Sequence, residues 1–144
     1  MASASTTEVF NCTPDQFFDL ITEYEKYPEF LQEVKQVTVL KTEQNRRLVE
    51  FHVSVIKSFS YSLWLTEERP REIRWEFASG DVFKTNSGYW RLQEQAGKTS
   101  VDYSVEATFK LFVPGPIAKT LVSVNLPNMM AAYHKRVASL YGQV

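Results

Sequence analysis

Hydrophobic and polar residues alternate along the middle of the chain, from Val34 to Leu111. A period of two residues is typical of strands that bury one face of a sheet. Turn-forming clusters such as Glu43-Gln44-Asn45 and Ser79-Gly80-Asp81 interrupt the alternation. The pattern predicts about six strands, with their apolar positions in residues 34–39, 49–55, 59–65, 73–77, 82–92 and 101–111. Because the turns have hairpin length, we expect an antiparallel meander.

The apolar period changes to that of an amphipathic helix over residues 114–141. Pro114 and Pro116 suit a first helical turn, whose N–H groups lack partners, and Gly142 suits a helix end. Pro127 lies inside this stretch and should bend the helix around residues 122–126. One apolar stripe is formed by Val122, Leu126, Met129, Tyr133, Val137 and Leu140, and it is widened by Met130 and Tyr141.

The N-terminal region predicts a short strand followed by a first helix. Residues 6–11 have strand character, and Thr13 followed by Pro14 is a strong helix start. The residue before a proline avoids helical angles, so this helix should end before Pro28. Residues 27–31 then form a turn or a second helical piece. The apolar face of the first helix carries Phe17, Phe18, Leu20, Ile21 and Tyr24.

These elements predict an α+β fold in which one long helix follows a run of strands. An antiparallel sheet of this size twists and curls. The C-terminal helix buries its apolar stripe only if it lies in the concave side of that sheet. We therefore expect a curved antiparallel sheet wrapped around a long C-terminal helix. A length of 144 residues favours a single domain that spans residues 1–144.

The composition is that of a folded protein without a strong charge bias. Lys and Arg number 16 and Asp and Glu 17, so no basic excess favours a nucleic-acid partner. Cys12 is the only cysteine, which excludes an intramolecular disulfide and favours a reducing compartment. Neither a signal-peptide pattern nor an apolar run of about 20 residues is present. We expect a cytoplasmic protein.

The sequence contains few residue patterns typical of enzymes. It predicts no catalytic residues, no metal site and no cofactor. No glycine-rich phosphate loop or metal-ligand motif is present. His52 lies on the polar face of its strand and is expected to be exposed. His134 lies at the edge of the helix stripe, where a structural role is favoured over a catalytic one. Cys12 either packs as a small buried residue or is activated by the neighbouring helix start.

Three motifs, taken in order, resemble those of a known superfamily. They are Tyr27-Pro28-Glu29-Phe30-Leu31, Gly88-Tyr89-Trp90, and residues 129–137 followed by Leu140-Tyr141-Gly142. The chain resembles the START-like helix-grip superfamily, in its polyketide cyclase/dehydrase and coenzyme Q-binding protein-like branch. The resemblance implies an apolar cavity between sheet and helix that takes lipids, quinones, sterols or polyketides. The segment 110–126 departs from the quinone-binding members, and this leaves the ligand open.

Together, the inward strand positions and the resemblance predict a ligand site facing the C-terminal helix. An ordinary packed core is the alternative for each single residue. Gly88 either leaves space beside the indole of Trp90 or marks a bulge whose space a neighbouring segment fills. Arg136 is either a polar ligand anchor or a surface-directed, ion-paired side chain. The candidate ligand-binding residues are Phe51, Trp75, Phe77, Gly88, Trp90, Tyr103, Phe109, Met129, Met130, Tyr133 and Arg136.

The leading hypothesis is a non-enzymatic module that binds or transports a hydrophobic small molecule such as a lipid, quinone or polyketide-like compound. A transient membrane contact is left open, and nucleic acid is not expected. One alternative is a polyketide aromatase/cyclase-type enzyme that uses Tyr103, Arg136 or His134 in the same cavity. Another alternative is a module that docks on a ribosome or another protein, because one fold hosts many functions.

Overall fold

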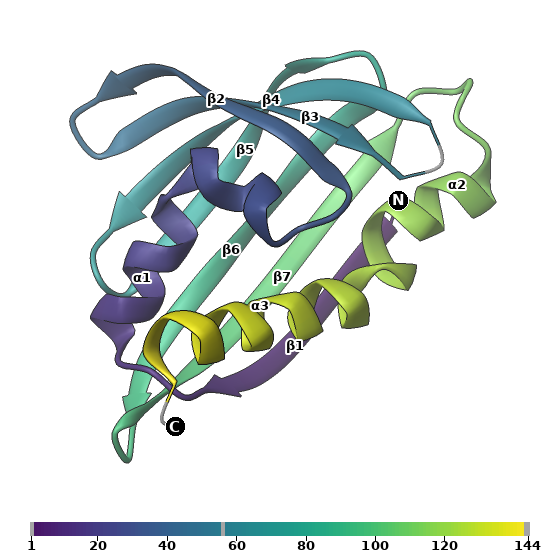
Figure 1. The fold of residues 1–144 in the computed structure, drawn as a ribbon. Helices are drawn as coiled ribbons and strands as arrows, with labels where there is room; N and C mark the ends of the chain where they lie inside the picture. Colours follow the sequence, from purple (N-terminus) through teal and green to yellow (C-terminus); the bar gives the residue numbers. More distant parts are fainter. Residues whose placement is uncertain (1, 56, 143–144) are drawn as a thin grey trace.

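The computed structural model describes residues 2–55 and 57–142, and these form one curved sheet with helices on its concave side (Figure 1). All neighbouring strands are antiparallel. The strands are β1 (Ala2–Phe10), β2 (Val34–Glu43), β3 (Arg46–Ser54), β4 (Ser58–Glu68), β5 (Glu72–Gly80), β6 (Phe83–Gln95) and β7 (Lys98–Phe109). The helices are α1 (Pro14–Thr22), the 3₁₀-helix η1 (Tyr24–Glu29), α2 (Gly115–Lys119), the π-helical turn η2 (Thr120–Val124) and α3 (Leu126–Tyr141).

The predicted helix-grip architecture is confirmed. The sheet order is β1-β7-β6-β5-β4-β3-β2, so β2 to β7 form the expected meander. The first strand is longer than expected, because Ala2 to Phe10 all pair with β7. Its alternating residues are mostly small, which gives a weak strand signal from sequence. The last strand is shorter than expected: β7 ends at Phe109, and Leu111 lies fully exposed beyond it.

The first helix begins as its sequence predicts. The Thr13 hydroxyl accepts a hydrogen bond from the Gln16 amide at 3.1 Å, and the Gln16 side chain accepts one from the Thr13 amide at 3.0 Å. This reciprocal capping box satisfies two amides that a helix start leaves free. The α-helix ends at Thr22, and η1 continues the helical path through Pro28. Tyr24 therefore belongs to η1.

The C-terminal helix is interrupted where Pro127 predicts a bend. Proline lacks the N–H needed for an interior helical hydrogen bond, and its ring displaces the preceding turn. The chain accommodates this with η2, a π-helical turn, before α3 restarts with Pro127 in its first turn. Figure 1 shows the chain changing direction between α2 and α3. Leu140 is 44% exposed, so its expected place on the buried stripe is wrong; it lies in the last turn of α3.

Gly88 is not a bulge, contrary to one of the two sequence interpretations. It pairs in continuous register with Trp75 of β5 and Val105 of β7. The irregularity between β6 and β7 lies instead between Phe83 and Thr85. A Cβ atom at Gly88 would overlap the indole of Trp75 and the carbonyl oxygen of Ser104. The Trp75 ring thus fills the space that glycine leaves.

We predict that Gly88→Ala lowers the free energy of unfolding by about 1–3 kcal/mol, because an extra methyl overpacks the sheet at Trp75. Gly115→Ala is the matched control, since a Cβ there meets no atom within 4 Å. Urea unfolding followed by tryptophan fluorescence measures both. Equal stability of the two variants would contradict the close packing of Trp75 on Gly88.

Candidate functional site

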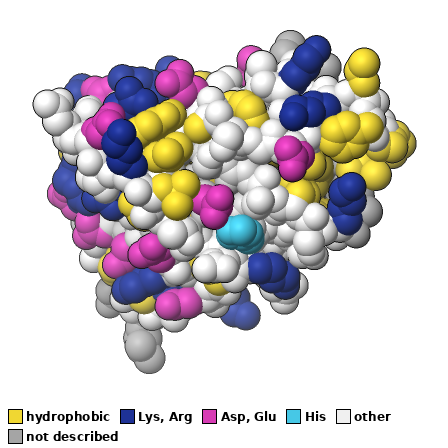
Figure 2. All heavy atoms as spheres, turned by 90° about the horizontal axis from the view of Figure 1, so that it is seen from above, with side chains coloured by type: hydrophobic (Ala, Val, Ile, Leu, Met, Phe, Trp, Pro, Cys, Tyr) yellow, Lys and Arg dark blue, Asp and Glu magenta, His cyan; other side chains and the backbone are white. Residues whose placement is uncertain are grey.

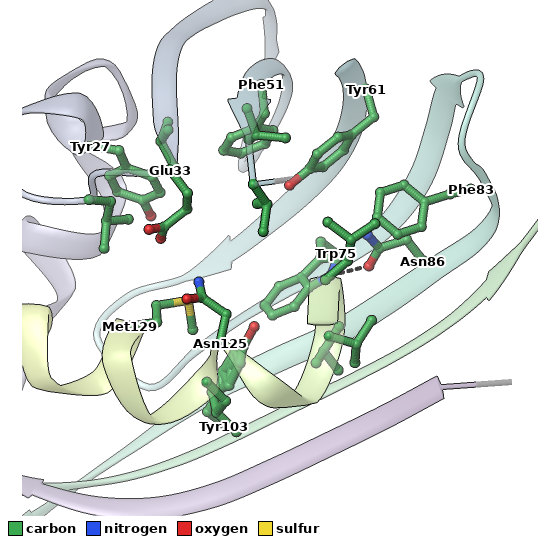
Figure 3. A pocket seen from close by; sticks show the side chains of 18 of the residues that line it. Tyr27, Glu33, Phe51, Tyr61, Trp75, Phe83, Asn86, Tyr103, Asn125 and Met129 are labelled. Atoms are coloured by element: carbon green, nitrogen blue, oxygen red, sulfur yellow. Dashed lines mark hydrogen bonds between the residues drawn. The ribbon is translucent and has the colours of Figure 1, made fainter. Parts of the chain in front are cut away.

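A cavity of about 190 Å³ lies between the concave face of the sheet and the C-terminal helical segment (Figure 3). Strands β3 to β7 supply one wall, and η2 and α3 supply the opposite wall. The segment that joins η1 to β2 closes one side with Leu31 and Glu33. Most of the lining is apolar or aromatic, which is the composition of small-molecule pockets.

The cavity brings together six of the side chains that the sequence nominates. Trp75 and Trp90 come from neighbouring strands, and both rings pack against Tyr103 at centroid distances of 5.8 and 4.6 Å. Tyr133 of α3 meets Trp90 edge to face at 5.1 Å. Side chains from the strands and from α3 thus meet at one cavity, as the strand alternation and the helical stripe predict. The nominated residues that line the cavity are Phe51, Trp75, Trp90, Tyr103, Met129 and Tyr133.

Five nominated residues lie outside the cavity lining. Phe77 and Phe109 pack against Phe83, whose ring reaches the cavity in their place. Met130 is buried on another side of α3, next to Ser3 and Ala4 of β1. The lining residues also exclude Gly88, which Trp75 covers, and Arg136.

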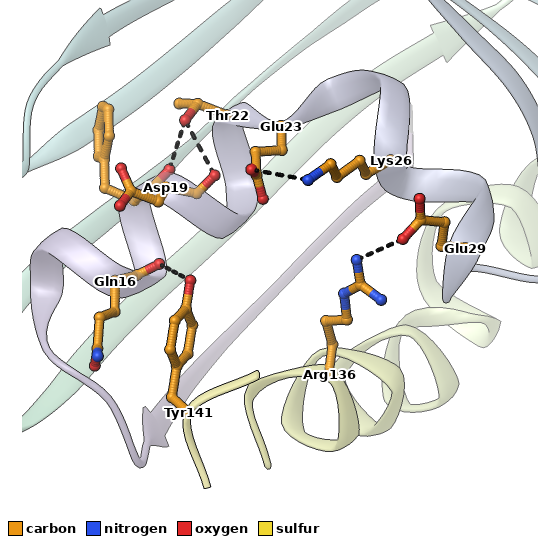
Figure 4. Close-up of polar contacts among 9 residues, drawn as sticks. Gln16, Asp19, Thr22, Glu23, Lys26, Glu29, Arg136 and Tyr141 are labelled. Atoms are coloured by element: carbon orange, nitrogen blue, oxygen red, sulfur yellow. Dashed lines mark hydrogen bonds and ion pairs between the residues drawn. The ribbon is translucent and has the colours of Figure 1, made fainter. Parts of the chain in front are cut away.

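Arg136 belongs to an ion pair between α3 and η1. Its Nη2 atom donates to Glu29 Oε1 at 2.8 Å (Figure 4). The guanidinium also lies over the ring of Phe30, at 5.1 Å from the ring centroid. Tyr141 makes a second link from α3, donating to the Gln16 carbonyl at 3.2 Å. Arg136 therefore adopts the ion-paired alternative, and it holds the helix in place instead of facing a ligand.

The polar groups of the cavity come mostly from residues that the sequence analysis did not single out. The Trp75 indole donates to Asn86 Oδ1 at 3.1 Å, and the Tyr27 hydroxyl donates to the Ile21 carbonyl. The hydroxyl of Tyr61 has no hydrogen-bond partner among the described residues, and neither has that of Tyr103. Burial raises the pKa of both hydroxyls well above the ordinary value, so they stay protonated at neutral pH.

Tyr61 follows the same alternation as its neighbours Phe59 and Leu63, so the period of two could have identified it. Glu33 lies in an irregular segment between η1 and β2, where neither the strand period nor the helix period applies. Asn125 lies between η2 and α3, three residues after Val122 and four before Met129, so the helical period could have placed it beside the stripe. Figure 3 shows the side chains of Glu33 and Asn125 directed into the cavity from opposite walls. Their inward direction depends on the packed fold.

His134 and Cys12 have structural roles. His134 lies outside the cavity, where it contacts Glu8 at 2.7 Å and stacks on Phe10 at 4.2 Å. The hydrogen bond with His134 lowers the pKa of Glu8. Burial raises the pKa of the Cys12 thiol to about 11, so the packing interpretation holds and activation by the helix start does not.

His52 is partly exposed, with 42% of its side chain accessible, and it pairs with Glu50 on the same strand at 2.9 Å. Within residues 2–55 and 57–142, the acidic, histidine and cysteine side chains form no group of three or more that could hold a metal ion. None of the helices in the described part of the chain has the length and apolarity needed to cross a membrane.

Comparison with solved structures defines the fold as START-like. A START superfamily protein from Mycobacterium smegmatis superimposes with a TM-score of 0.84 at 20% identity, over 96% of this chain and 98% of that one. A protein from Thermus thermophilus gives a TM-score of 0.84 at 16% identity, over 97% and 99% of the two chains. The ZhuI aromatase/cyclase from Streptomyces sp. R1128 gives a TM-score of 0.70 at 16% identity, over 96% of this chain and 87% of that one.

A family model described as "Polyketide cyclase / dehydrase and lipid transport" matches residues 11–133. The chain therefore belongs to this family. No curated protein matches it in sequence. These solved structures are less than 25% identical to the chain, so their likeness concerns the fold alone.

We predict that a leucine of α1 in the packed core and a leucine of α3 at the cavity respond differently to truncation to alanine. Leu20 is 2% exposed in the core, and Leu20→Ala should lower the free energy of unfolding by about 2–5 kcal/mol. Leu126 is half-buried and already borders the cavity, so Leu126→Ala should lower it by about 1 kcal/mol or less. Urea unfolding of both variants measures the difference. Equal losses would mean that Leu126 is packed as tightly as Leu20.

Proposed function

We propose that this protein binds or transports a hydrophobic small molecule in the cavity between sheet and helix, without catalysing its reaction. The observation that carries the proposal is an aromatic cavity in which two tyrosine hydroxyls lack partners among the described residues. A tyrosine hydroxyl that faces an apolar cavity can hydrogen-bond to a complementary polar group of a ligand. An apolar wall with a few placed polar groups is the usual design of such sites.

The size of the cavity favours a compact ligand. A volume of about 190 Å³ exceeds the roughly 150 Å³ of an engineered apolar cavity that takes benzene. It is smaller than the roughly 300 Å³ at which pockets for drug-sized ligands begin. A ring compound of polyketide type therefore fits better than a long-chain lipid or a quinone with its tail. A longer ligand requires the helical wall to move.

The α2–η2 segment provides a route of entry. A second, smaller hollow lies beside the cavity, and Phe59 and Leu121 border both. Ile117 of the short α2 helix borders the second hollow, and Leu121 of the π-helical turn separates it from the cavity. Displacing a short, interrupted helix disturbs fewer contacts than displacing α3, so we expect ligands to enter beneath this segment.

The aromatase/cyclase alternative is less well supported by the geometry. It assigns polar roles to Tyr103, Arg136 and His134, and only Tyr103 faces the cavity. Arg136 and His134 are paired with Glu29 and Glu8 outside it. The ring hydroxyl of Tyr103 has a raised pKa, which suits a hydrogen-bond donor better than a general base.

We further propose that residues 1–144 form one domain and that the protein works in the cytoplasm. The described residues form one sheet of seven strands and one connected core, which supports the first point. The lone Cys12 thiol, which is buried, is compatible with a reducing compartment.

We predict that the cavity binds naphthalene-type probes in solution. In ¹H–¹⁵N spectra, the indole N–H signals of Trp75 and Trp90 should shift on titration, because both rings line the cavity. The signal of Trp64, whose ring is covered by Arg46, should stay and serves as an internal control. Val105→Phe, which fills the cavity, should weaken binding at least tenfold. Solvent extraction and mass spectrometry of the purified protein test for a natural ligand. Unchanged spectra for all probes would contradict the proposal.

A transient membrane contact is proposed at the α2 end. Leu111, Phe112 and Val124 are 101%, 60% and 61% exposed. In Figure 2, hydrophobic side chains gather at the right end of the molecule, beside lysine or arginine side chains. Lys110 directly precedes Leu111 in sequence, and Lys119 lies between Phe112 and Val124. Apolar anchors combined with basic residues attract anionic lipid surfaces.

We predict that the protein sediments with vesicles of phosphatidylcholine and phosphatidylglycerol. The double substitution Leu111→Ser and Phe112→Ser should reduce the bound fraction several-fold, because it removes the apolar anchors. Leu140→Ser is the matched control, since Leu140 is 44% exposed on the last turn of α3. A similar reduction with the control, or no sedimentation of the unmodified protein, would sink the proposed contact.

A further inference from the structure

Glu33 is the only charged residue among the described residues that line the cavity. It lies in the segment between η1 and β2, where its main chain is fixed: its carbonyl oxygen accepts a hydrogen bond from the Ser54 amide at 2.8 Å. Val34, the next residue, pairs with Val53 of β3. The side chain is half-buried, and Figure 3 shows its carboxylate directed into the cavity.

The carboxylate of Glu33 has no ion-pair partner within the described chain. The arginines near the helical layer are used elsewhere, because Arg136 pairs with Glu29 and Arg69 pairs with Asp19. The other polar groups of the cavity are neutral tyrosine hydroxyls and asparagine amides. Burial is the main cause of the raised pKa of Tyr61 and of Tyr133, and the negative charge of Glu33 adds to it in both cases.

A carboxylate that faces an apolar cavity without a cation discriminates between ligands by charge. An anionic ligand would bring a second negative charge into a poorly solvated space, where like charges repel strongly. A protonated amine would instead form a charge-assisted hydrogen bond with Glu33. Specificity of this kind rests on repulsion of the wrong ligand as much as on attraction of the right one.

We propose that the cavity selects compact apolar compounds that carry a protonated amine and rejects those that carry a carboxylate, with Glu33 as the residue that decides. This inference rests on the proposed binding function and names its ligand class. The aromatic wall formed by Trp75, Trp90 and Tyr103 receives the ring system, and the amine lies at the Glu33 end of the cavity. Fatty acids and other apolar acids are therefore poor ligands.

The test uses three probes of nearly equal shape, namely naphthylethylamine, naphthylethanol and naphthylacetic acid, each titrated into the full chain at pH 7. The indole signals of Trp75 and Trp90 report binding. We expect the amine to bind about tenfold more tightly than the alcohol, and the acid to bind most weakly. Glu33→Gln should bring the amine to the level of the alcohol and improve binding of the acid. The alcohol should change less than about twofold.

Glu76→Gln is the matched control, because it removes the same charge from an exposed position on β5 that does not line the cavity. Its ranking of the three probes should equal that of the unmodified protein. Alcohol binding also reports whether Glu33→Gln is folded. If Glu33→Gln does not fold, the ranking of amine and acid in the unmodified protein decides whether the cavity selects ligands by charge. An acid that binds as tightly as the amine overturns the charge selection and leaves the binding function intact. Failure of all three probes overturns both.

Discussion

The packing of Tyr133 is the contact on which the rest of the structure depends. Its ring lies 5.1 Å from Trp90 of β6, 5.2 Å from Phe30 and 6.2 Å from Phe17 of α1. One side chain of α3 thereby meets the sheet, the first helix and the segment that leads into β2. Aromatic pairs at such distances stabilise a fold beyond the area they bury. The position of α3 in the grip, and hence one wall of the cavity, is set by this contact.

The core is densely packed on one side of Tyr133 and open on the other. Toward the C-terminal end of α3, Val137 is almost completely buried and belongs to the hydrophobic core. Toward η2, the side chains that face the sheet are Leu126, Met129 and Asn125, and they leave a cavity. A curved sheet cannot be filled along its whole length by one interrupted helix. The cavity is the volume that remains where the helix changes direction.

The sequence predicts the fold well because burial imposes simple periods on strands and helices. The alternation placed Trp75, Trp90 and Tyr103 on one face, and the helical period added Met129 and Tyr133. Those periods do not say how far a side chain reaches, so Phe83 displaced Phe77 and Phe109 from the cavity. Gly88 could not be interpreted without knowing that Trp75 covers it. Glu33 was missed because an irregular segment has no period, and its direction follows from the main-chain hydrogen bond to Ser54.

The pairing of β1 with β7 has a consequence for the order of folding. Ala2 lies opposite Ala107, so the first and the last strand in the sequence are neighbours in the sheet. During synthesis, β1 leaves the ribosome long before β7 has been synthesised. Until then, the backbone amide and carbonyl groups of β1 have no strand to pair with. Contacts between residues so distant in sequence slow folding, because a long loop must close first. The meander of β2 to β7 can form from local hairpins, so we expect β1 to join the sheet last.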